Sequence, residues 1–411
     1  MAKHTFFWVV LVALILRLGV LFLGYHGDLN NNISWGTFAV DRGLINFYEG
    51  EGWPNSAPNQ PPLTLLLFAL TRIAWLGVET SIWWLNNNIP IFPSPLIWFW
   101  EQKGMILLVK LPSLVADLAI GVLIYNFFKK DRKAFLLSSL WLFNPLVWYN
   151  SSIWGQTDSI VNLLGLLGIL ALLERRLTKF LVWFTLSLLF KGSLAIFIPI
   201  LAYVAIKQKY HVGQWVKASA ISLLVIILAS VWFHPQLDLL TWLADLYQKR
   251  ILPGEIGYLT ANAFNFWWLV DPGKVLDSTL YLGLPARVLG AVATGFGISL
   301  VILWLTKEVT PKKIFFALSV TSLISFLFMT RIHERYLYPF FVPATFLLGF
   351  LPGLLWIYLG FAVIHLINLY NLFWVPGFAP LEAQLLVSWF TQALAVTHLF
   401  FFVMWSKSFK K

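Results

Sequence analysis

Apolar runs long enough to cross the roughly 30 Å hydrocarbon core of a lipid bilayer recur from one end of this sequence to the other. Only 11% of the residues are charged, against about 25% in soluble domains, so packing inside a soluble core does not account for these runs. A membrane β-barrel would instead show alternating segments of about 10 residues, a pattern that the sequence lacks. The sequence therefore predicts an all-α, polytopic membrane protein.

Hydropathy predicts about 12 membrane-spanning helices, which would place both chain termini on one side. The expected spans are residues 6–24, 104–127, 134–150, 157–174, 178–190, 193–206, 215–233, 281–305, 313–330, 335–350, 354–370 and 386–405. No small-residue cleavage site follows the first of them, so we expect a retained helix and not a removed signal peptide. The whole chain, residues 1–411, is interpreted as a single membrane domain.

Two long polar and aromatic stretches interrupt the helices, a first loop at residues 25–103 and a second loop at residues 234–280. Within the first loop, the segment 61–77 is apolar enough to span the membrane. A crossing there would force the acidic segment 78–103 into the cytoplasm and would invert every later loop. We therefore expect 61–77 to be a helix at the outer interface, with its proline pair at the helix start.

The distribution of charge predicts which side of the membrane each loop occupies. The short loops on one side are rich in basic residues, among them Lys129, Lys130, Arg132, Lys133, Arg175, Arg176, Lys179, Lys307, Lys312 and Lys313. By the positive-inside rule this side is cytoplasmic and carries both termini, in the plasma membrane if the source is prokaryotic. The net charge of +11 follows from this topology, since no motif of a nucleic-acid-binding module accompanies it. The acid-bearing outer face is therefore the predicted working face.

Four clusters of polar residues are expected on that outer face. A charged side chain at membrane depth is costly and usually faces a cavity or a partner. They are Asp28 with Asn30, Asn31, Asn32 and Trp35; Trp154 with Gln156 and Asp158; Lys191 between two helices too short to cross fully; and Arg331, His333, Glu334 and Arg335. A simpler interpretation remains open for each cluster. A lone aspartate or an asparagine run is often an ordinary turn. Charges at helix ends, such as Arg72, Lys103, Lys249 and Arg250, often only reach to the lipid headgroups.

Together these residue types are suited to transferring a group from a phosphate-activated lipid. Lys191, Arg331, Arg335 and a protonated His333 could hold a phosphate and stabilise its charge as it leaves. A carboxylate on a facing loop could take the proton from an attacking hydroxyl. The chain contains no cysteine, which excludes disulfides and cysteine-ligated metals.

Five short motifs, in order along the chain, resemble those of the GT-C superfamily of integral-membrane glycosyltransferases. They are GDLNNNISW after the first span, QPPLT at 60–64, KLPSLVADL at 110–118, NPLVWYNSSIWGQTDS at 144–159 and RIHERYLYP at 331–339. They are most similar to motifs of the hexosyltransferases that use polyprenyl-phosphate sugars, which include dolichyl-phosphate-glucose glucosyltransferases and bacterial mannosyltransferase-like proteins. Gln60 stands where that family usually has tyrosine.

The resemblance implies a GT-C-like fold and transfer of a hexose from a polyprenyl-phosphate donor to a glycan, lipid or protein acceptor. It implies that Asp28 is the general base of an inverting reaction, with Asp158 as a helper or an alternative base. The donor phosphate would bind His333, Arg331, Arg335 and Lys191. Substrate would contact Asn32, Trp35, Trp154, Gln156, Asn262 and Glu334. Lys110 and Asp117 match a helix motif of the family.

Some relatives carry an Asp-X-Asp pattern that is associated with a metal, but this chain has Asp28, Leu29 and Asn30. We therefore expect no metal and no other cofactor, although a divalent metal is not excluded. Asn262 lies in LTANAFNFWW, which resembles a family segment but is equally compatible with an interfacial helix.

Two other functions remain open from the sequence. A lipid-linked glycan polymerase or ligase would also work at the outer face and could use the loop 234–280. A polyprenyl-lipid transporter or flippase would more often show inverted repeats and polar groups near the membrane midplane. The sequence identifies neither the sugar nor the acceptor.

Overall fold

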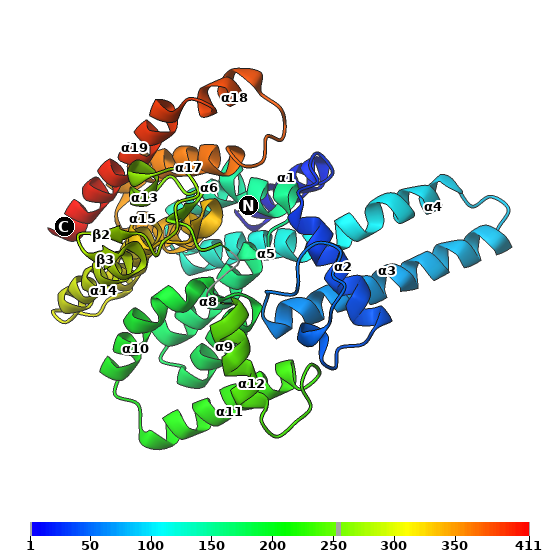
Figure 1. Ribbon diagram of the computed structural model, residues 1–411, viewed down its shortest axis with the longest axis horizontal. Coiled ribbons are helices and arrows are strands. Elements are labelled where there is room, and N and C mark those ends of the chain that lie inside the picture. The colour runs from blue at the N-terminus through cyan, green and yellow to red at the C-terminus, as the bar shows by residue number, and fades with distance from the viewer. Residues whose placement is uncertain (1, 252–255, 411) are drawn as a thin grey trace.

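The computed structural model describes residues 2–251 and 256–410, and its regular structure is almost entirely helical (Figure 1). Its helices are α1 (Ala2–Val20), α2 (Asp28–Asp41), α3 (Pro62–Asn88), α4 (Pro95–Phe99), α5 (Met105–Phe127), α6 (Lys133–Leu142), α7 (Pro145–Trp148), α8 (Asp158–Leu173), α9 (Leu177–Phe190), α10 (Ile198–Lys207), α11 (Val212–Ser230), α12 (Leu239–Leu246), α13 (Phe266–Val270), α14 (Ala286–Leu305), α15 (Pro311–Phe328), α16 (Tyr338–Phe350), α17 (Leu355–Tyr370), α18 (Ala379–Leu385) and α19 (Ser388–Ser406). The short strands are β1 (Thr260–Ala261), β2 (Leu280–Tyr281), β3 (Leu284–Pro285) and β4 (Ile332–His333).

Seven of the described helices are long and apolar enough to cross a membrane, judged by length and composition. They are Pro62–Asn88, Pro95–Phe127, Val212–Ser230, Ala286–Leu305, Pro311–Phe328, Pro352–Tyr370 and Ser388–Ser406. All except Pro62–Asn88 coincide with expected spans. Shorter apolar helices cover His4–Val20, Lys133–Leu142, Asp158–Leu173, Leu177–Phe190 and Gly192–Lys207. The expectation of a helical membrane protein is confirmed at this level, while the expected number of spans stays a prediction.

Several expected boundaries were wrong for local reasons. The expected helix 134–150 breaks at Pro145, which has no N–H to donate, and a π-helical turn, Tyr149–Trp154, follows α7. The Asn144 side chain caps the new helix by accepting the Leu146 N–H at 3.2 Å. The first loop, 25–103, is also more regular than expected. Residues 28–41 form α2, and α3 continues past 77 to Asn88.

The largest hydrophobic core is built around α15 and α16, whose residues are buried on nearly all sides. Helices that are apolar all round are suited to such a central position. A second core joins α2, α3 and the start of α5. This smaller core fixes α2 in place, and α2 carries the first polar cluster.

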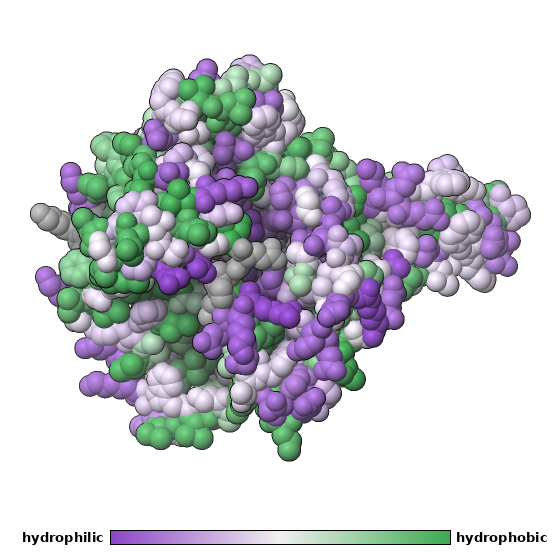
Figure 2. Space-filling model, viewed as in Figure 1, coloured by the Kyte–Doolittle hydropathy of each residue, from purple (hydrophilic) through white to green (hydrophobic). Residues whose placement is uncertain are grey.

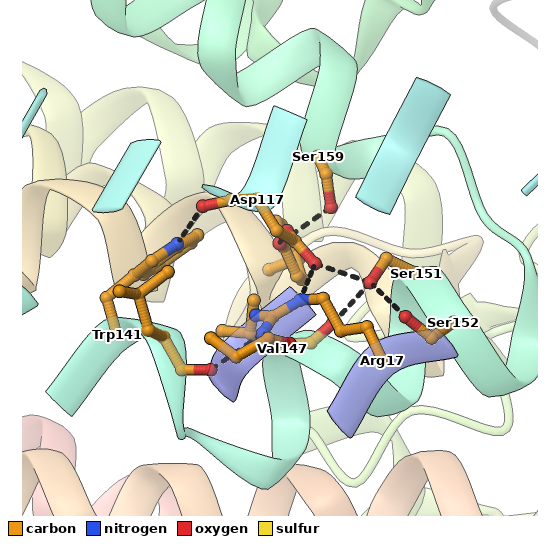
Figure 3. A network of polar contacts seen from close by, with 10 residues as sticks. Arg17, Asp117, Trp141, Val147, Ser151, Ser152 and Ser159 are labelled. Atoms are coloured by element: carbon orange, nitrogen blue, oxygen red, sulfur yellow. Dashed lines mark hydrogen bonds and ion pairs between the residues drawn. The ribbon is translucent and has the colours of Figure 1, made fainter. Parts of the chain in front are cut away.

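Arg17 and Asp117 are fully buried charges that tie α1 to α5 (Figure 3). Arg17 Nε lies 3.5 Å from Asp117 Oδ2. The hydroxyls of Ser151 and Tyr338 also donate to the Asp117 carboxylate, the latter at 3.0 Å. A buried charge is tolerated when it is paired and hydrogen-bonded in this way. The network holds the π-helical turn Tyr149–Trp154 against both helices. That turn ends at Trp154 and is followed closely by Gln156.

Candidate functional site

A polar cavity of about 380 Å³ brings together residues from distant parts of the chain. Most of the residues predicted to form the site line it: Asp28, Asn32, Trp35, Gln156, Lys191, Asn262, His333 and Arg335. Trp154, Asp158, Glu334 and Arg331 do not line the cavity, and each has a different position that is described below. The four expected polar clusters therefore converge on one space, as the sequence predicts.

One face of α2 forms the first wall of the cavity. Asp28, Asn31, Asn32 and Trp35 all line it. Residues spaced by three and four positions share one side of a helix, so a helix starting at Asp28 presents all four to the same space. The interpretation of the asparagine run as a turn was therefore wrong. Two contacts to Ser56 fix this face: Asn31 Oδ1 accepts its N–H at 3.1 Å, and Trp35 Nε1 donates to its carbonyl at 3.0 Å.

The Asp28 carboxylate is oriented by the π-helical turn and by the chain just before α2. Gln156 Nε2 donates to Asp28 Oδ2 at 2.5 Å, and Trp154 Nε1 donates to the same oxygen at 3.3 Å. His26 Nδ1 lies 3.4 Å from Oδ2, and its ring packs 4.7 Å from that of Trp154. Within the described part of the chain, Oδ1 accepts no hydrogen bond and is left for another partner. Trp154 thus positions Asp28 from behind the cavity wall.

The surroundings of Asp28 keep its carboxylate ionised. Burial acts to raise the pKa of Asp28, but the contact with His26, the positive charge of Arg335 and the hydrogen bond from Gln156 lower it well below its ordinary value. Asp28 therefore carries a negative charge throughout the neutral pH range.

Lys191, a lining residue of the cavity, forms a buried ion pair with Asp158. Lys191 Nζ donates to Asp158 Oδ1 at 2.8 Å, and the exposed fractions of the two side chains are 10% and 1%. Burial lowers the pKa of Lys191, while the negative charge of Asp158 acts to raise it. The carboxylate of Asp158 does not line the cavity itself but holds the Lys191 ammonium there. A helper or alternative base, the role expected for Asp158, would instead need to reach the cavity.

Arg335 is a second cation that lines the cavity, and Glu334 supports it. Arg335 Nη1 donates to Glu334 Oε1 at 2.7 Å, and Glu334 is fully buried. His333 lines the cavity beside them, with Nδ1 3.8 Å from Glu334 Oε2. Burial and the charges of Arg335 and Lys191 lower the pKa of His333 to about 3. The condition under which His333 would hold a phosphate as a cation, protonation near neutral pH, is therefore not met, first because the ring is buried and then because Arg335 and Lys191 lie near it.

Arg331 lies away from the cavity and pairs with the second loop. Its Nε donates to Asp277 Oδ2 at 2.6 Å and its Nη2 to Asp277 Oδ1 at 3.2 Å. A two-point contact of this kind fixes the orientation of both groups. The prediction that Arg331 binds the donor phosphate is not supported by this position, since the guanidinium lies against Asp277.

The second loop delivers Asn262 to the cavity through short strands. Strands β1 and β4 pair in parallel, and Asn262 forms a further bridge with His333. The carbonyl of Asn262 accepts a hydrogen bond from Asn368 Nδ2 at 2.6 Å, which anchors it to α17. Residues 252–255 of this loop lie outside the described residues. Asn262 is thus in the position expected of a substrate-binding residue and is not part of an interfacial helix.

No protein-family model and no curated protein matches this sequence. What the site can do chemically is therefore inferred from the residues that line it and from the residues that contact them.

Several cavity residues were missed by sequence reasoning. His26, Thr64, Arg250 and Tyr336 all line the cavity. Asn31, which was grouped with Asp28 but given no role, also lines it, and the helical spacing from Asp28 could have indicated this. Arg250 was interpreted as a membrane-boundary residue, yet it faces the cavity and donates a hydrogen bond to the Tyr48 carbonyl. No comparable signal marks Tyr336, whose ring lies 5.7 Å from Lys191 Nζ.

Among the described residues, no three His, Asp or Glu side chains form a group that could hold a metal ion. The expectation that the chain needs no metal and no other cofactor stays a prediction.

A second, mainly apolar cavity of about 240 Å³ adjoins the polar one. Gln60, Lys191 and Tyr336 line both. The remaining lining comes largely from apolar residues, including Ile196, Phe326, Met329 and Ile332. Lys191 therefore stands at a boundary between a polar and an apolar space.

Lys110 binds the parts of the chain that hold Asp28 in position. Its fully buried Nζ donates to the carbonyls of Leu21 at 2.8 Å, Gly24 at 2.9 Å and Ile153 at 2.7 Å. Three acceptors satisfy all three donors of an ammonium group. Gly24 precedes Asp28, and Ile153 precedes Trp154, so one side chain joins the segment that carries Asp28 to the turn that supports it.

We expect Lys110→Met to loosen both of these segments, because each buried carbonyl left without a partner costs about 1–3 kcal/mol. Hydrogen–deuterium exchange in detergent should become faster at residues 21–28 and 149–156 and should stay unchanged in α9 and α11. Lys103→Met, on the same continuous helix, is the matched control and should leave exchange unaltered. Unchanged protection at residues 21–28 in Lys110→Met would contradict this role.

Proposed function

We propose that this chain is a membrane glycosyltransferase of GT-C type. It transfers a hexose from a polyprenyl-phosphate donor to an acceptor hydroxyl of a glycan, lipid or protein, with inversion at the anomeric carbon. The observation that carries the proposal is that one ionised carboxylate, Asp28, and two cations, the buried Lys191 and the partly buried Arg335, line one cavity.

In this reaction Asp28 Oδ1 takes the proton of the acceptor hydroxyl as its oxygen attacks the anomeric carbon. The bond from that carbon to the phosphate oxygen breaks, and its electron pair stays on the departing polyprenyl phosphate. Lys191 and Arg335 stabilise the charge that develops on this phosphate. Because attack and departure occur on opposite sides of the sugar, a single displacement inverts the configuration. Asn32 and Asn262 are the proposed hydrogen-bonding partners of the sugar, and Trp35 is a proposed surface for its apolar face.

The adjoining apolar cavity supports a lipid-linked donor. Lys191 and Tyr336 line both cavities, so a phosphate beside Lys191 would have the sugar on its polar side and a hydrocarbon chain on its apolar side. A free sugar nucleotide would gain nothing from the apolar space.

Charge placement supports reaction on the outer face. Asp28 follows the end of α1, and the basic residues Lys129, Lys130 and Lys133 follow the end of α5. The two helices are antiparallel, with the ring of Phe6 stacked at 3.8 Å on that of Tyr125. The cavity and the basic turn therefore lie at opposite ends of this helix pair. With the basic turn cytoplasmic, the cavity faces outward and both termini face the cytoplasm.

The test of this function uses the purified chain in nanodiscs with radiolabelled polyprenyl-phosphate glucose or mannose and an extract of lipid-linked acceptors. Transfer of label to the acceptor by the wild-type chain is the expected result, and the active donor identifies the sugar. Transfer only from diphosphate-linked oligosaccharides would indicate a polymerase or ligase. Movement of intact lipid across the bilayer without transfer would indicate a flippase.

We expect kcat/KM to change by less than about two-fold between roughly pH 5 and pH 7, because neither the Asp28 carboxylate nor the His333 imidazole titrates in that range. Asp28 stays ionised since its pKa lies well below its ordinary value, and His333 stays neutral down to a pKa of about 3. The measurement is a pH–rate profile with saturating and limiting donor. An acid limb with an apparent pKa near 6.5 would contradict it, because that limb would report His333 or another ordinary histidine.

A further inference from the structure

A separate pocket of about 300 Å³ lies where three turns of the chain meet, those from α8 to α9, from α10 to α11 and from α14 to α15. We call it the basic pocket. Its lining includes the polar residues Arg175, Lys207 and Gln208 and the apolar residues Leu173, Val309 and Ile314. Among the described residues that line it, two are cations and none is a carboxylate. The proposed reaction uses none of these residues.

Helices α8 and α15 both connect the substrate cavities with the basic pocket. Asp158, which pairs with Lys191, is the first residue of α8, and the last residue of α8 is Leu173. Pro311, the first residue of α15, also lines the basic pocket, whereas Phe326 near the other end lines the apolar cavity. These helices of 16 and 18 residues are about 24 and 27 Å long, close to the thickness of a hydrocarbon core. The basic pocket therefore lies about one hydrocarbon thickness away from the polar cavity.

The surroundings of the basic pocket are those of a membrane–water interface. Tyr210 packs edge-on against Trp215 at the start of α11, and Trp304 lies in the last turn of α14 with Lys313 Nζ 5.4 Å from its ring. Aromatic and basic side chains at helix ends are typical of this level of a bilayer. The apolar helices α11 and α14 are mostly exposed, and Figure 2 shows hydrophobic residues over the edge of the molecule that they form. Acyl chains of lipid can therefore lie directly beside the pocket.

The backbone holds Arg175 in a conformation that favours glycine. Its φ is +59°, and the N–H groups of Arg175 and Arg176 bond the carbonyls of Leu172 at 3.0 Å and Ala171 at 2.8 Å. This pattern ends a helix with one left-handed residue, a position usually taken by glycine or asparagine. A residue kept in such a conformation despite its cost is a reason to look for a function of its side chain. The arginine side chain at this turn lines the basic pocket.

Hydrogen bonds of Gln208 fix the two turns that carry the cations. Its Nε2 donates to the Leu172 carbonyl at 2.9 Å, which joins the end of α10 to the end of α8. Its Oε1 accepts from the Tyr210 hydroxyl. Lys207 precedes it, with Nζ 5.6 Å from the ring of Tyr203. The pocket is therefore preorganised, because neither turn can move without breaking these bonds.

The positive charge of the basic pocket is not neutralised by the neighbouring acids. Glu174 lies 3.2 Å from Arg176, and Glu308 lies 2.9 Å from Lys313, so each pairs with a base outside the lining. Within the part of the chain that the structure describes, neither cation of the pocket forms an ion pair with a carboxylate. Two cations on fixed turns are suited to holding an anion.

We infer that the basic pocket binds the phosphate headgroup of an anionic phospholipid, in the leaflet opposite the polar cavity. The Arg175 guanidinium can contact a phosphate at two points, and Lys207 adds a second charge. The apolar lining, together with the exposed Ile206 and Leu303 beside it, suits the glycerol and acyl parts of a lipid. A soluble phosphate would gain nothing from these apolar surfaces. If the cavity faces outward, this leaflet is the cytoplasmic one, where anionic lipids attract basic residues.

Photolabelling tests the occupant of the pocket. The purified chain is placed in phosphatidylcholine nanodiscs with a small amount of phosphatidylglycerol that carries a photoreactive group near its headgroup, and labelled peptides are identified by mass spectrometry. Labelling is expected at residues 173–176, 206–210 and 303–311, and unlabelled phosphatidylglycerol should compete for it. Equal competition by phosphatidylcholine would indicate ordinary surrounding lipid and would overturn the inference. Competition by inorganic phosphate would identify a soluble phosphate as the occupant and would overturn the assignment to lipid.

Charge variants test the two cations. Arg175→Gly with Lys207→Gln removes both charges, and glycine suits the left-handed backbone, so the thermal midpoint in detergent should not fall. Preference for phosphatidylglycerol over phosphatidylcholine should drop by about 20–30-fold, roughly five-fold for each cation.

Arg176→Gln with Lys179→Gln is the matched control, because it removes two exposed charges beside the same turn that do not line the pocket. It should keep the lipid preference. An equal loss in both double variants would indicate general attraction to a basic surface and would overturn the inference. Neither experiment measures glycosyl transfer, so the result is independent of the proposed function.

Discussion

Asp28→Asn is expected to lower kcat by about 10²–10⁴-fold while leaving the amount of folded protein unchanged. An amide has the shape of the carboxylate and can still accept from Gln156 and Trp154, but it cannot take a proton from the acceptor. The measurement is the initial rate of transfer from the labelled donor at saturating concentration. KM for the donor should change little, because the cations that hold its phosphate remain.

Asp41→Asn is the matched control for this variant, because it makes the same change in an exposed carboxylate at the far end of α2. It should retain normal turnover. If Asp28→Asn also retained near-normal turnover with intact folding, the assignment of the base would be wrong. Asp158→Asn would then be the next variant to measure.

Arg335→Gln is expected to lower kcat/KM by about 10²–10³-fold, the size of effect seen when one preorganised group that stabilises developing charge is lost. The same change leaves Glu334 buried without its partner, which costs several kcal/mol in folded proteins. Its thermal midpoint in detergent should therefore also fall.

The double variant Glu334→Gln with Arg335→Gln separates these two effects. Removing both charges relieves the unpaired carboxylate, so the thermal midpoint should recover toward that of the wild type. The rate should stay low, because the cation facing the phosphate is still missing. Recovery of activity together with stability would contradict a role for Arg335 in binding phosphate.

The residues that converge on the cavity could be predicted because charged and amide side chains are conspicuous in so apolar a chain. Asp28, Gln156, Lys191 and Arg335 lie far apart in sequence, and each follows or precedes an apolar run on the predicted outer side. Their predicted location at the outer ends of apolar runs was therefore enough to assign these four residues to one site.

Side-chain direction within a motif could not be predicted in the same way. Arg331 and Arg335 are four residues apart, yet one pairs with Asp277 and the other faces the cavity. The difference depends on the pairing of β4 with β1, a contact between distant segments that leaves no local pattern. The protonation state of His333 stayed open for a similar reason, since its pKa depends on burial and on two cations brought close by the fold.

Helix α2 shows the limit set by local propensity. Asparagine is a weak helix former and is favoured in turns, so Asn30, Asn31 and Asn32 indicated a turn. Packing of Leu29, Trp35 and Ala39 against α3 and α5 overrides that preference.

The three hydrogen bonds of Lys110 tie together the two chain segments that support Asp28. Asp28, Trp154 and Gln156 are joined through one ammonium to the end of α1 and to the π-helical turn, so they shift together or not at all. Asn262, which follows β1 and is anchored by Asn368, and His333 of β4 belong to other parts of the lining. In the proposed reaction Asp28 would then serve as the fixed point to which each incoming sugar is aligned.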